Sequence, residues 1–402
     1  MLGRRMVTAT GIAMLALATA AAFAAPAATA TSAATAASAR ARSPTGPATA
    51  NLITALIVNG SSTVTPLHET GTTSSAIGVA GSLEAAFTPN GRTAYVIGGD
   101  VVTPIAITDG VVASAQPAIT LPHRSHGHAD GVAIAVTPNG KIALAVNNFA
   151  PYWVTWINTA TNTVTAKVKV GISPIEIAIT PNGKYAYVTN AEAGTVTPIV
   201  IATHKALRAI KVGFSPEAIA ITPNGKYAYV ANNLSNTVSP IRIAGNKALR
   251  PIKVGGFPAA IAITPNGKYA YVTNNGSRSV SQISIASRKV VATIRVASFP
   301  DNIVITPNGR YAYVASFNGQ AIDTHLHTVT VIRLSTGHVL AHITVGNGPI
   351  ALGFSNLTQT VYVANFYADS VTPIRVSTNT AGPAIGLAGQ HEPTFIAIDP
   401  QP

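Results

Sequence analysis

The sequence predicts an all-β fold: a single β-propeller with eight blades of four strands each. The string Thr-Pro-Asn-Gly begins at Thr88, Thr137, Thr180, Thr222, Thr264 and Thr306, and the last four copies lie 42 residues apart. Around these copies, residue types alternate with a period of two, the spacing of a strand rather than a helix. Each unit has room for four short strands, as a propeller blade requires.

One unit shows how the four strands arise. Isoleucine alternates with alanine along 218–221, so each residue type faces one side of a first strand. Asn224-Gly225 then closes a tight hairpin, because both residue types tolerate a positive φ. The second, third and fourth strands are expected at 227–230, 237–241 and 248–254.

Five of the expected third strands contain a proline, which has no N–H group to donate to a sheet ladder. We therefore expect a bulge or an unpaired position at these residues. They are Pro66, Pro104, Pro198, Pro240 and Pro373.

Counting the strands gives the number of blades. First strands begin near Ala85, Ala133, Glu176, Ala218, Ala260, Asn302, Ala351 and Phe395, and second strands near Ala55, Ala94, Ala143, Ala186, Ala228, Ala270, Ala312 and Val361. The chain thus opens on a second strand and closes on a first strand, so 395–399 should pair with 55–58 and seal the ring. Seven blades is the alternative, in which one degenerate unit is lost.

The N-terminal residues 1–24 are predicted to be a secretory signal peptide. Arg4 and Arg5 precede a run of small apolar residues at 11–23, and Ala24 ends an A-x-A cleavage pattern. Residues 25–50, rich in Ala, Thr, Ser and Pro, are predicted to be a disordered linker, and 51–402 form the propeller. The protein is therefore expected to be secreted or associated with the cell wall, without a transmembrane span.

Composition limits the chemistry and the partners. The chain has no cysteine, which excludes disulfides and thiolate metal sites. Its formal net charge is +13, which favours an anionic cell-wall polymer or a glycan as partner. Charge alone also allows nucleic acid, although no motif supports it. We expect a monomer.

The repeat also carries a family resemblance. Tyr187-Val188-Thr189-Asn190 and residues 271–274, with the same four letters, occur beside Pro-Asn-Gly turns. The chain thereby resembles the YVTN-repeat β-propellers, which include YncE-like bacterial proteins and archaeal surface-layer proteins. The resemblance covers nearly all of 51–402 and implies the propeller fold, but it implies no particular activity.

The two faces of such a ring differ in their expected charge. We call the face with the loops that lead into the first strands the top, and the face with the Asn-Gly hairpins the bottom. Ten of the thirteen acidic residues are expected on top: Glu84, Asp100, Asp130, Glu176, Glu192, Glu217, Asp301, Asp323, Asp369 and Glu392. On the bottom, one cation follows each repeated turn: Arg92, Lys141, Lys184, Lys226, Lys268 and Arg310.

Histidine-rich insertions in the top loops are candidate metal ligands, since imidazole and carboxylate suit zinc, copper or nickel. They predict a divalent metal site among His123, His126, His128, Asp130, His325, His327, His391 and Glu392. A solvated polar loop explains the same residues without a metal.

Aromatic residues share these loops. Phe149, Tyr152, Trp153, Phe366 and Tyr367, beside the carboxylates Glu84, Glu176, Glu217 and Asp301, are candidate ligand-binding residues for sugars or peptide side chains. Phe214, Phe257 and Phe299 precede first strands and are expected to plug the mouth of the ring.

Two functions remain open. The sequence favours a non-enzymatic binding or scaffold protein with its ligand on the acidic top face, because no nucleophile elbow, phosphate loop or H-E-x-x-H motif occurs. The alternative is a metal-dependent hydrolase of lactonase type, an activity found among related propellers, in which the metal activates water. An eight-bladed ring also resembles the haem-binding domain of some nitrite reductases, but no motif supports a haem.

Overall fold

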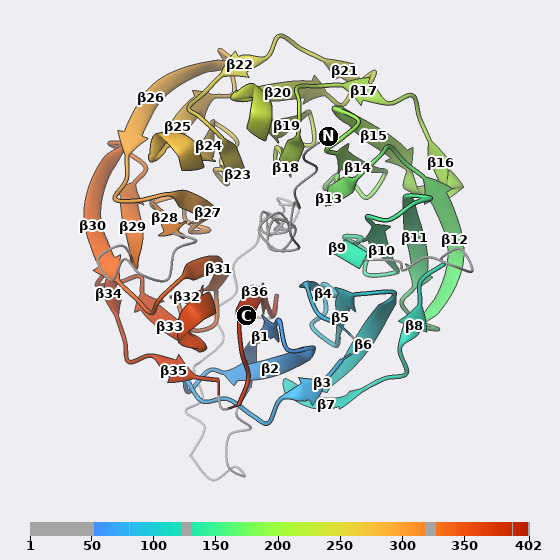
Figure 1. Ribbon diagram of the computed structural model, residues 1–402, viewed down its shortest axis with the longest axis vertical. Coiled ribbons are helices and arrows are strands. Elements are labelled where there is room, and N and C mark those ends of the chain that lie inside the picture. Colours follow the sequence, from blue (N-terminus) through green and yellow to red (C-terminus); the bar gives the residue numbers. More distant parts are fainter. Residues whose placement is uncertain (1–51, 80, 123–130, 318–326, 388, 401–402) are drawn as a thin grey trace, which may run out of the picture.

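The computed structural model describes residues 52–79, 81–122, 131–317, 327–387 and 389–400. They form eight antiparallel sheets arranged as blades around one axis (Figure 1). The all-β propeller with eight blades is thus confirmed. Within the described ranges, no helix has the length and hydropathy that a membrane crossing requires.

Each blade has an inner, a second, a third and an outer strand. Blade 1 contains β36 (Pro393–Ile398), β1 (Ile53–Asn59), β2 (Thr63–His68) and β3 (Ile77–Gly78). Blade 2 contains β4 (Glu84–Phe87), β5 (Thr93–Gly98), β6 (Val101–Thr108), β7 (Val111–Ala115) and β8 (Ile119–Thr120). Blade 3 contains β9 (Gly131–Val136), β10 (Ile142–Asn147), β11 (Trp153–Asn158) and β12 (Thr163–Lys169). Blade 4 contains β13 (Pro174–Ile179), β14 (Tyr185–Asn190), β15 (Thr195–Val200), β16 (Lys205–Ala206) and β17 (Ile210–Lys211).

The second half of the ring repeats this order. Blade 5 contains β18 (Pro216–Ile221), β19 (Tyr227–Asn232), β20 (Thr237–Arg242), β21 (Lys247–Ala248) and β22 (Ile252–Lys253). Blade 6 contains β23 (Pro258–Ile263), β24 (Tyr269–Asn274), β25 (Ser279–Ser284) and β26 (Lys289–Arg295). Blade 7 contains β27 (Pro300–Ile305), β28 (Tyr311–Ser316), β29 (Thr328–Arg333) and β30 (His338–Thr344). Blade 8 contains β31 (Pro349–Ser355), β32 (Thr360–Asn365), β33 (Ser370–Arg375), β34 (Thr380–Ala381) and β35 (Ile385–Gly386).

Within the described residues, four short 3-10 helices interrupt the connecting segments. They are η2 (Ile201–Thr203), η3 (Asn233–Ser235), η4 (Asn275–Ser277) and η5 (Phe366–Ala368). The last three lie between second and third strands and therefore on the top face.

Blade 1 closes the ring as predicted. Its inner strand β36 comes from the end of the chain and pairs with β1 from the start, with Ala55 opposite Ile398 and Val58 opposite Phe395. Every residue of β1 is buried. The two ends of the chain are therefore held together by a sheet ladder and by burial.

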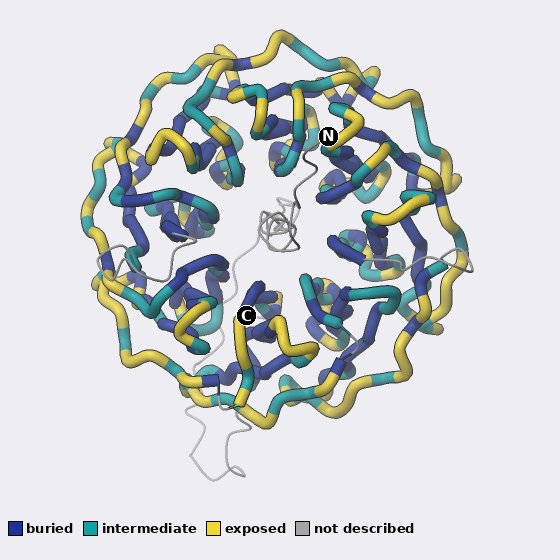
Figure 2. Tube along the Cα trace, in the orientation of Figure 1, coloured by how far each residue is buried: buried dark blue, intermediate teal, exposed yellow. Residues whose placement is uncertain are grey.

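The core lies between neighbouring blades. Figure 2 shows buried second and third strands and a largely exposed outer ring. Tyr95, Tyr187, Tyr229, Tyr271 and Tyr313 occupy equivalent positions of second strands and are fully buried. Burying such a side chain stabilises the fold by about 2 kcal/mol, so the repeated tyrosine is a major contribution of each blade.

The Thr-Pro-Asn-Gly hairpins differ in one detail from the sequence prediction. Gly225 has the positive φ of +64°. Asn224 does not; instead its side-chain Oδ1 accepts hydrogen bonds from the Thr222 hydroxyl (2.8 Å) and the Lys226 amide (3.0 Å). The asparagine is therefore an acceptor that tightens the turn rather than a residue with a special backbone conformation.

The third-strand prolines interrupt the outer strand, as expected. In blade 5 the Pro240 carbonyl accepts from the Leu249 amide, so the ring nitrogen on the same side faces the outer strand. There the ladder breaks into β21 and β22. In blade 6, Gln282 takes the proline position, and β26 pairs along its whole length with a single bulge. The missing N–H group therefore decides whether the outer strand is continuous.

Candidate functional site

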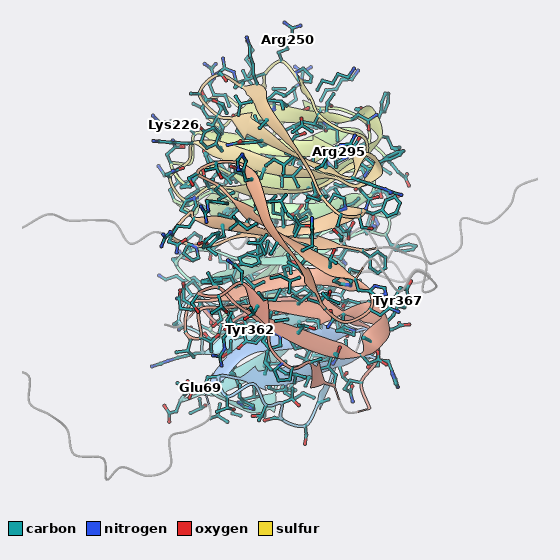
Figure 3. All side chains as sticks on the ribbon, turned by 90° about the vertical axis from the view of Figure 1, so that its left-hand side faces the viewer. Glu69, Lys226, Arg250, Arg295, Tyr362 and Tyr367 are labelled. Carbon is teal, nitrogen blue, oxygen red and sulfur yellow. The ribbon has the colours of Figure 1, made fainter. Side chains whose placement is uncertain are left out.

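The two faces of the ring carry different residues. In the side view of Figure 3, Lys226, in the β18–β19 hairpin, lies on one side, and Tyr367, in η5, lies on the opposite side. The first is the bottom face and the second is the top face. The predicted site residues that the structure describes are at or near the top.

Two glutamates at equivalent positions of inner strands are buried in the wall of the ring. Glu84 in β4 is 1% exposed and Glu176 in β13 is 4% exposed. Each reaches the next blade, where Glu176 Oε2 accepts from the Ile219 amide at 2.9 Å and Glu84 Oε1 from the Ile134 amide at 3.5 Å. These amides lie in inner strands, which have a strand neighbour on one side only. The carboxyl groups thus take the acceptor role that a further strand would have.

Burial governs the pKa values of these two groups. Desolvation raises the pKa of Glu84 and of Glu176 well above the usual value, and the hydrogen bonds from Ile134 and Ile219 only partly oppose it. The charge of Glu84 raises the pKa of Glu176 further. One oxygen of Glu84, Oε2, is buried without a hydrogen-bond partner in the described protein.

A second pair of carboxyl groups stands one residue earlier in the repeat. Glu217 in β18 and Asp301 in β27 both follow a proline and are half-buried. Desolvation raises the pKa of Glu217 to about 8, opposed by a hydrogen bond from Ser215 and raised further by the charge of Asp301. Desolvation likewise raises the pKa of Asp301 to about 7.

These shifts change the expected character of the top face. The four carboxyl groups lie where the sequence places them, but burial favours their uncharged form near neutral pH. A protonated carboxyl both donates and accepts hydrogen bonds. These four groups therefore carry less negative charge than the residue count predicts, whereas Asp369 on the same face has a lowered pKa.

Large apolar side chains are exposed on the same face. Among the described residues, ten large hydrophobic side chains are exposed, and four of these belong to outer strands. The other six lie in top loops: Phe149, Ile172, Phe214, Leu234, Phe257 and Tyr367. We call these six the apolar crown. Phe214 is 76% exposed and Phe257 is 50% exposed, so the expectation that they plug the mouth is wrong for both.

The aromatic residues of blade 3 divide between core and surface. Phe149 is 49% exposed, whereas Tyr152 packs against the core between blades 3 and 4. Trp153 is half-buried beneath Lys167, whose Nζ lies 5.1 Å from the ring centroid. Of the three predicted binding residues in this loop, Phe149 alone is presented to solvent.

A second aromatic group joins blades 7 and 8. Phe366 and Tyr367 lie against Phe317, with ring centroids 6.3 Å and 5.8 Å away, and 5.1 Å from each other. Phe317 is buried and fixes the two outer rings. Sequence reasoning missed Phe317 because it stands where the repeat ends and an insertion begins.

Only some of the residues predicted to bind a metal belong to the described part of the chain. His123, His126, His128, Asp130 and His325 lie outside the described residues. Of the others, His391 Nδ1 pairs with Asp369 Oδ2 at 2.8 Å, and the Glu392 amide donates to Asp369 Oδ1 at 2.8 Å. His327 lies elsewhere, where its Nδ1 accepts from the Gly348 amide at 3.5 Å. Within the described ranges, no three His, Asp or Glu side chains are grouped to hold a metal ion.

Asp369 was not a predicted ligand-binding residue. Burial would raise its pKa, but the hydrogen bonds from His391 and Glu392 outweigh that effect and lower it. Asp369 has a φ of +46° at the end of η5, where equivalent blades have Asn236 and Arg278. An aspartate at a position where other blades have asparagine or arginine was the sequence feature that could have identified this residue.

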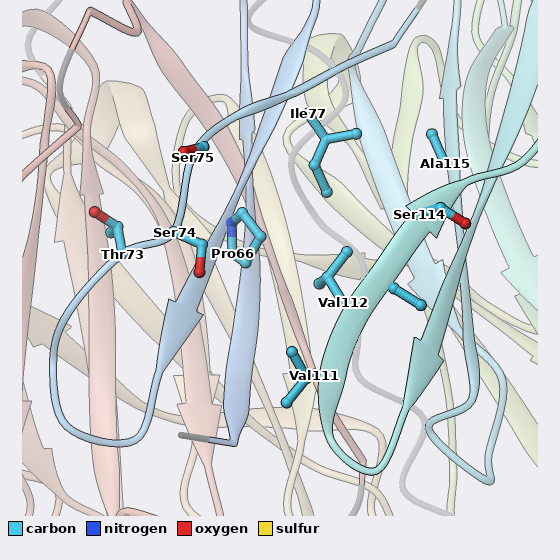
Figure 4. Close-up of a pocket in the computed structure, with 10 residues that line it drawn as sticks. Pro66, Thr73, Ser74, Ser75, Ile77, Val111, Val112, Ser114 and Ala115 are labelled. Carbon is cyan, nitrogen blue, oxygen red and sulfur yellow. The ribbon is translucent and has the colours of Figure 1, made fainter. Parts of the chain in front are cut away.

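A groove of about 570 Å³ lies at the rim between blades 1 and 2. Figure 4 shows β7 along one side and the segment around Ser74 and Ser75, with Pro66, along the other. Its lining mixes hydroxyl-bearing residues with apolar ones such as Ile77, Val111 and Val112, and contains none of the predicted site residues.

Comparison with known families gives one match. The sequence profile described as "Lactonase, 7-bladed beta-propeller" matches residues 61–207 and 200–331, which together cover more than half of the chain. The ring has eight blades rather than the seven in that description. No curated protein matches the sequence.

Solved structures resemble the fold at low identity. Dihydro-heme d1 dehydrogenase NirN in complex with DHE is 12% identical, with a TM-score of 0.70, over 87% of this chain and 76% of that one. Kuenenia stuttgartiensis hydrazine synthase is 23% identical, with a TM-score of 0.56, over 69% and 94%. A functionally unknown protein from Desulfotomaculum acetoxidans is 14% identical, with a TM-score of 0.56, over 86% and 98%.

Proposed function

This chain belongs to the Lactonase, 7-bladed beta-propeller family, and on that premise we propose that it is a secreted or cell-surface binding protein that holds a glycan on its top face. The proposal concerns the apolar crown and the carboxyl groups beneath it. It assigns no catalytic step to them. Secretion rests on the predicted signal peptide at 1–24.

One observation carries the proposal: the distribution of exposed apolar side chains. Outside the outer strands, all of those in the described residues lie in top loops. Exposing Phe214 and Phe257 to water is unfavourable, by about 25 cal/mol for each Å² of apolar surface. Exposed apolar side chains that gather on one face of a soluble protein favour that face as a binding surface.

The chemistry of the face suits a glycan. A sugar ring has an apolar face of C–H groups that stacks on an aromatic ring, and hydroxyl groups at its edge. Glu217 and Asp301, with pKa values raised to about 8 and about 7, can donate and accept hydrogen bonds near neutral pH. Phe214 lies only three residues from Glu217, which gives one aromatic face and one carboxyl group on neighbouring backbone.

The test is a glycan-binding screen with the whole mature protein, beside a Phe214→Ala/Phe257→Ala variant. Because both side chains are exposed, we expect the free energy of unfolding to change by less than about 0.5 kcal/mol. Losing two stacking contacts of about 1 kcal/mol each should weaken binding roughly thirtyfold. A matched control, Val164→Ala/Val291→Ala, removes exposed apolar side chains from the outer strands β12 and β26.

The outcomes separate clearly. Binding that is lost in the Phe214/Phe257 variant and kept in the control supports the proposal. A ligand that binds both variants equally would place the site elsewhere. Absence of glycan binding in the unaltered protein would refute the glycan assignment.

A second candidate is hydrolysis of a lactone, favoured by family membership and by two carboxyl groups that titrate near neutral pH. A carboxylate can take a proton from water as its oxygen adds to the lactone carbonyl. The ring C–O bond then breaks, and a protonated carboxyl supplies the proton to the leaving oxygen. Glu217 and Asp301 are the described residues whose pKa values suit these two roles.

A lactone screen across pH 5–9 tests this candidate, with Glu217→Gln and Asp301→Asn as variants. Hydrolysis that both variants abolish would support it. A metal-dependent form of the reaction would draw on His123, His126 and His128. Titration with zinc, copper and nickel, beside a triple alanine variant of these histidines, decides that question independently of any turnover.

A further inference from the structure

The bottom face presents six cations at equivalent positions of six consecutive blades. Each follows the glycine of a Thr-Pro-Asn-Gly hairpin, and each is exposed: Arg92, Lys141, Lys184, Lys226, Lys268 and Arg310. We call these six the hairpin cations. Their spacing follows from the repeat, so they form an arc around the bottom of the ring rather than a scattered set.

The backbone beneath these cations is fixed. In every one of the six hairpins the cation's amide donates to the asparagine Oδ1, at 3.0–3.1 Å. Neighbouring tips also touch, since a Cβ placed on Gly225 would lie 3.6 Å from Pro181 of the preceding blade. The same contact joins Gly267 to Pro223. The cations therefore project from a continuous, rigid rim.

Further cations reinforce the arc in blades 4–7. The third-to-outer turns add Lys205, Arg242, Lys247, Arg288, Lys289 and Arg333, all exposed. Among the described residues between 174 and 349, the acidic residues are Glu176, Glu192, Glu217 and Asp301. Three of them stand at the top ends of inner strands, and Glu192 lies in the top loop between β14 and β15. No ion pair within the described residues joins any of these cations to a carboxylate.

This face lacks the features that recognise bases. Binding of single-stranded nucleic acid relies on exposed aromatic rings on which bases stack. Of the ten exposed large hydrophobic side chains in the described chain, none is in a bottom hairpin. Tyr185, Tyr227 and Tyr269 follow hairpin cations, but they pack against the core between blades.

We propose that the bottom of blades 4–7 is a docking surface for a linear phosphodiester polymer without bases, of the kind built from polyol phosphates. A polymer with regularly spaced phosphates can pair with several hairpin cations at once and release its condensed counterions. The rigid rim means that little conformational entropy is lost on binding. Docking in this way leaves the apolar crown facing away from the polymer.

The experiment measures affinity for purified poly(glycerol phosphate) as a function of salt, using the mature protein. The test variant is Lys184→Gln/Lys226→Gln/Lys268→Gln/Arg310→Gln. Its control is Lys169→Gln/Lys211→Gln/Lys253→Gln/Arg295→Gln, which removes four exposed cations from the top ends of outer strands in blades 3–6. Both variants lose the same charge, so net charge alone cannot distinguish them.

We expect the test variant to bind several hundredfold more weakly, at about fivefold for each cation. The slope of log affinity against log salt should fall by about 3, because about 0.7 counterion is released for each phosphate neutralised. The control should keep most of both quantities. Equal losses in the two variants would overturn the proposal, as would an unchanged test variant.

Single-stranded DNA with the same number of phosphates is the competing ligand. Binding of DNA as tight as that of poly(glycerol phosphate), with the same salt slope, would overturn the preference for a polymer without bases. Because the substitutions lie on the bottom face, their effect is independent of the glycan test with Phe214 and Phe257.

Discussion

Burial of Glu217 makes the stability of the ring depend on pH. Its pKa rises from the ordinary value of 4.5 to about 8 on folding, so the folded protein holds a proton that the unfolded chain releases. Stability from this group is fully present below pH 4.5 and is lost as pH rises towards 8. At pH 7 the lost free energy of unfolding comes to about 3 kcal/mol. Water reaches the half-buried carboxyl, so we expect a net effect of about 2 kcal/mol.

The variant Glu217→Gln removes the titration and keeps a side chain of nearly the same size that can still bond to Ser215. Urea unfolding at pH 5 and pH 7.5 gives the free energy of unfolding in each case. The unaltered protein should lose about 2 kcal/mol more than the variant between these pH values. Glu192→Gln removes an exposed carboxyl from the loop between β14 and β15 as a control.

Each variant differs from the unaltered protein in one titrating group only, so a difference in pH dependence can be assigned to that group. If Glu217→Gln shows the same pH dependence as the unaltered protein, the carboxyl is solvated and the burial argument fails. If Glu192→Gln flattens the curve as much as Glu217→Gln does, the effect comes from net charge. Asp301 couples to Glu217, so an Asp301→Asn variant should show a smaller change of the same sign.

Three further predictions concern the repeat. Thr222→Val should lower the free energy of unfolding by about 2 kcal/mol in urea melts, because the Thr222 hydroxyl bonds to Asn224 and to the Tyr227 amide; an exposed Thr163→Val should not. Pro240→Gln should restore a donor facing the outer strand, so hydrogen exchange should slow between β21 and β22, whereas unchanged exchange would dismiss the proline as the cause. Gly255→Ala should lower the free energy of unfolding by about 2 kcal/mol, because the new Cβ would lie 2.7 Å from Asn274 Cγ. Adding Asn274→Ser should recover most of this loss, since blade 7 has Ala297 and Ser316 at the equivalent positions. A double-mutant cycle that shows no coupling between the two substitutions would contradict the argument.

The fold was predictable because the sequence pattern of each repeat indicates where its strands lie. Period-two alternation and the Thr-Pro-Asn-Gly turns locate the inner and second strands, and counting them gives eight blades and the pairing of β36 with β1. The prolines even indicate where the outer strand breaks. What the pattern hid was the role of Asn224, since a side-chain acceptor and a positive φ favour the same residue type at a turn.

The site was harder because its residues are small departures from a repeat. Glu176 and Glu217 are both acidic residues near the start of an inner strand, and the sequence predicts the same role for both. They differ by one position in the repeat, which turns Glu176 towards the next blade and buries it against Ile219. Glu217 remains half-buried with a pKa near neutrality. The residue type predicts a carboxyl group at both positions, but the position within the strand determines whether that group is buried.

The two faces also obey different constraints, which explains why one is regular and the other is not. On the bottom, a cation follows the Thr-Pro-Asn-Gly hairpin that blades 2–7 share, so the same residue types recur and their combined charge grows with each copy. On top, the residue types vary between equivalent loops: Ile172 stands where Phe214 and Phe257 precede other inner strands, and Asp369 stands where other blades have Asn236 and Arg278. A regular array suits a partner that is itself a repeating polymer, whereas an irregular, apolar surface suits one particular ligand. The two proposed partners would then not compete, because the sheets separate the two surfaces.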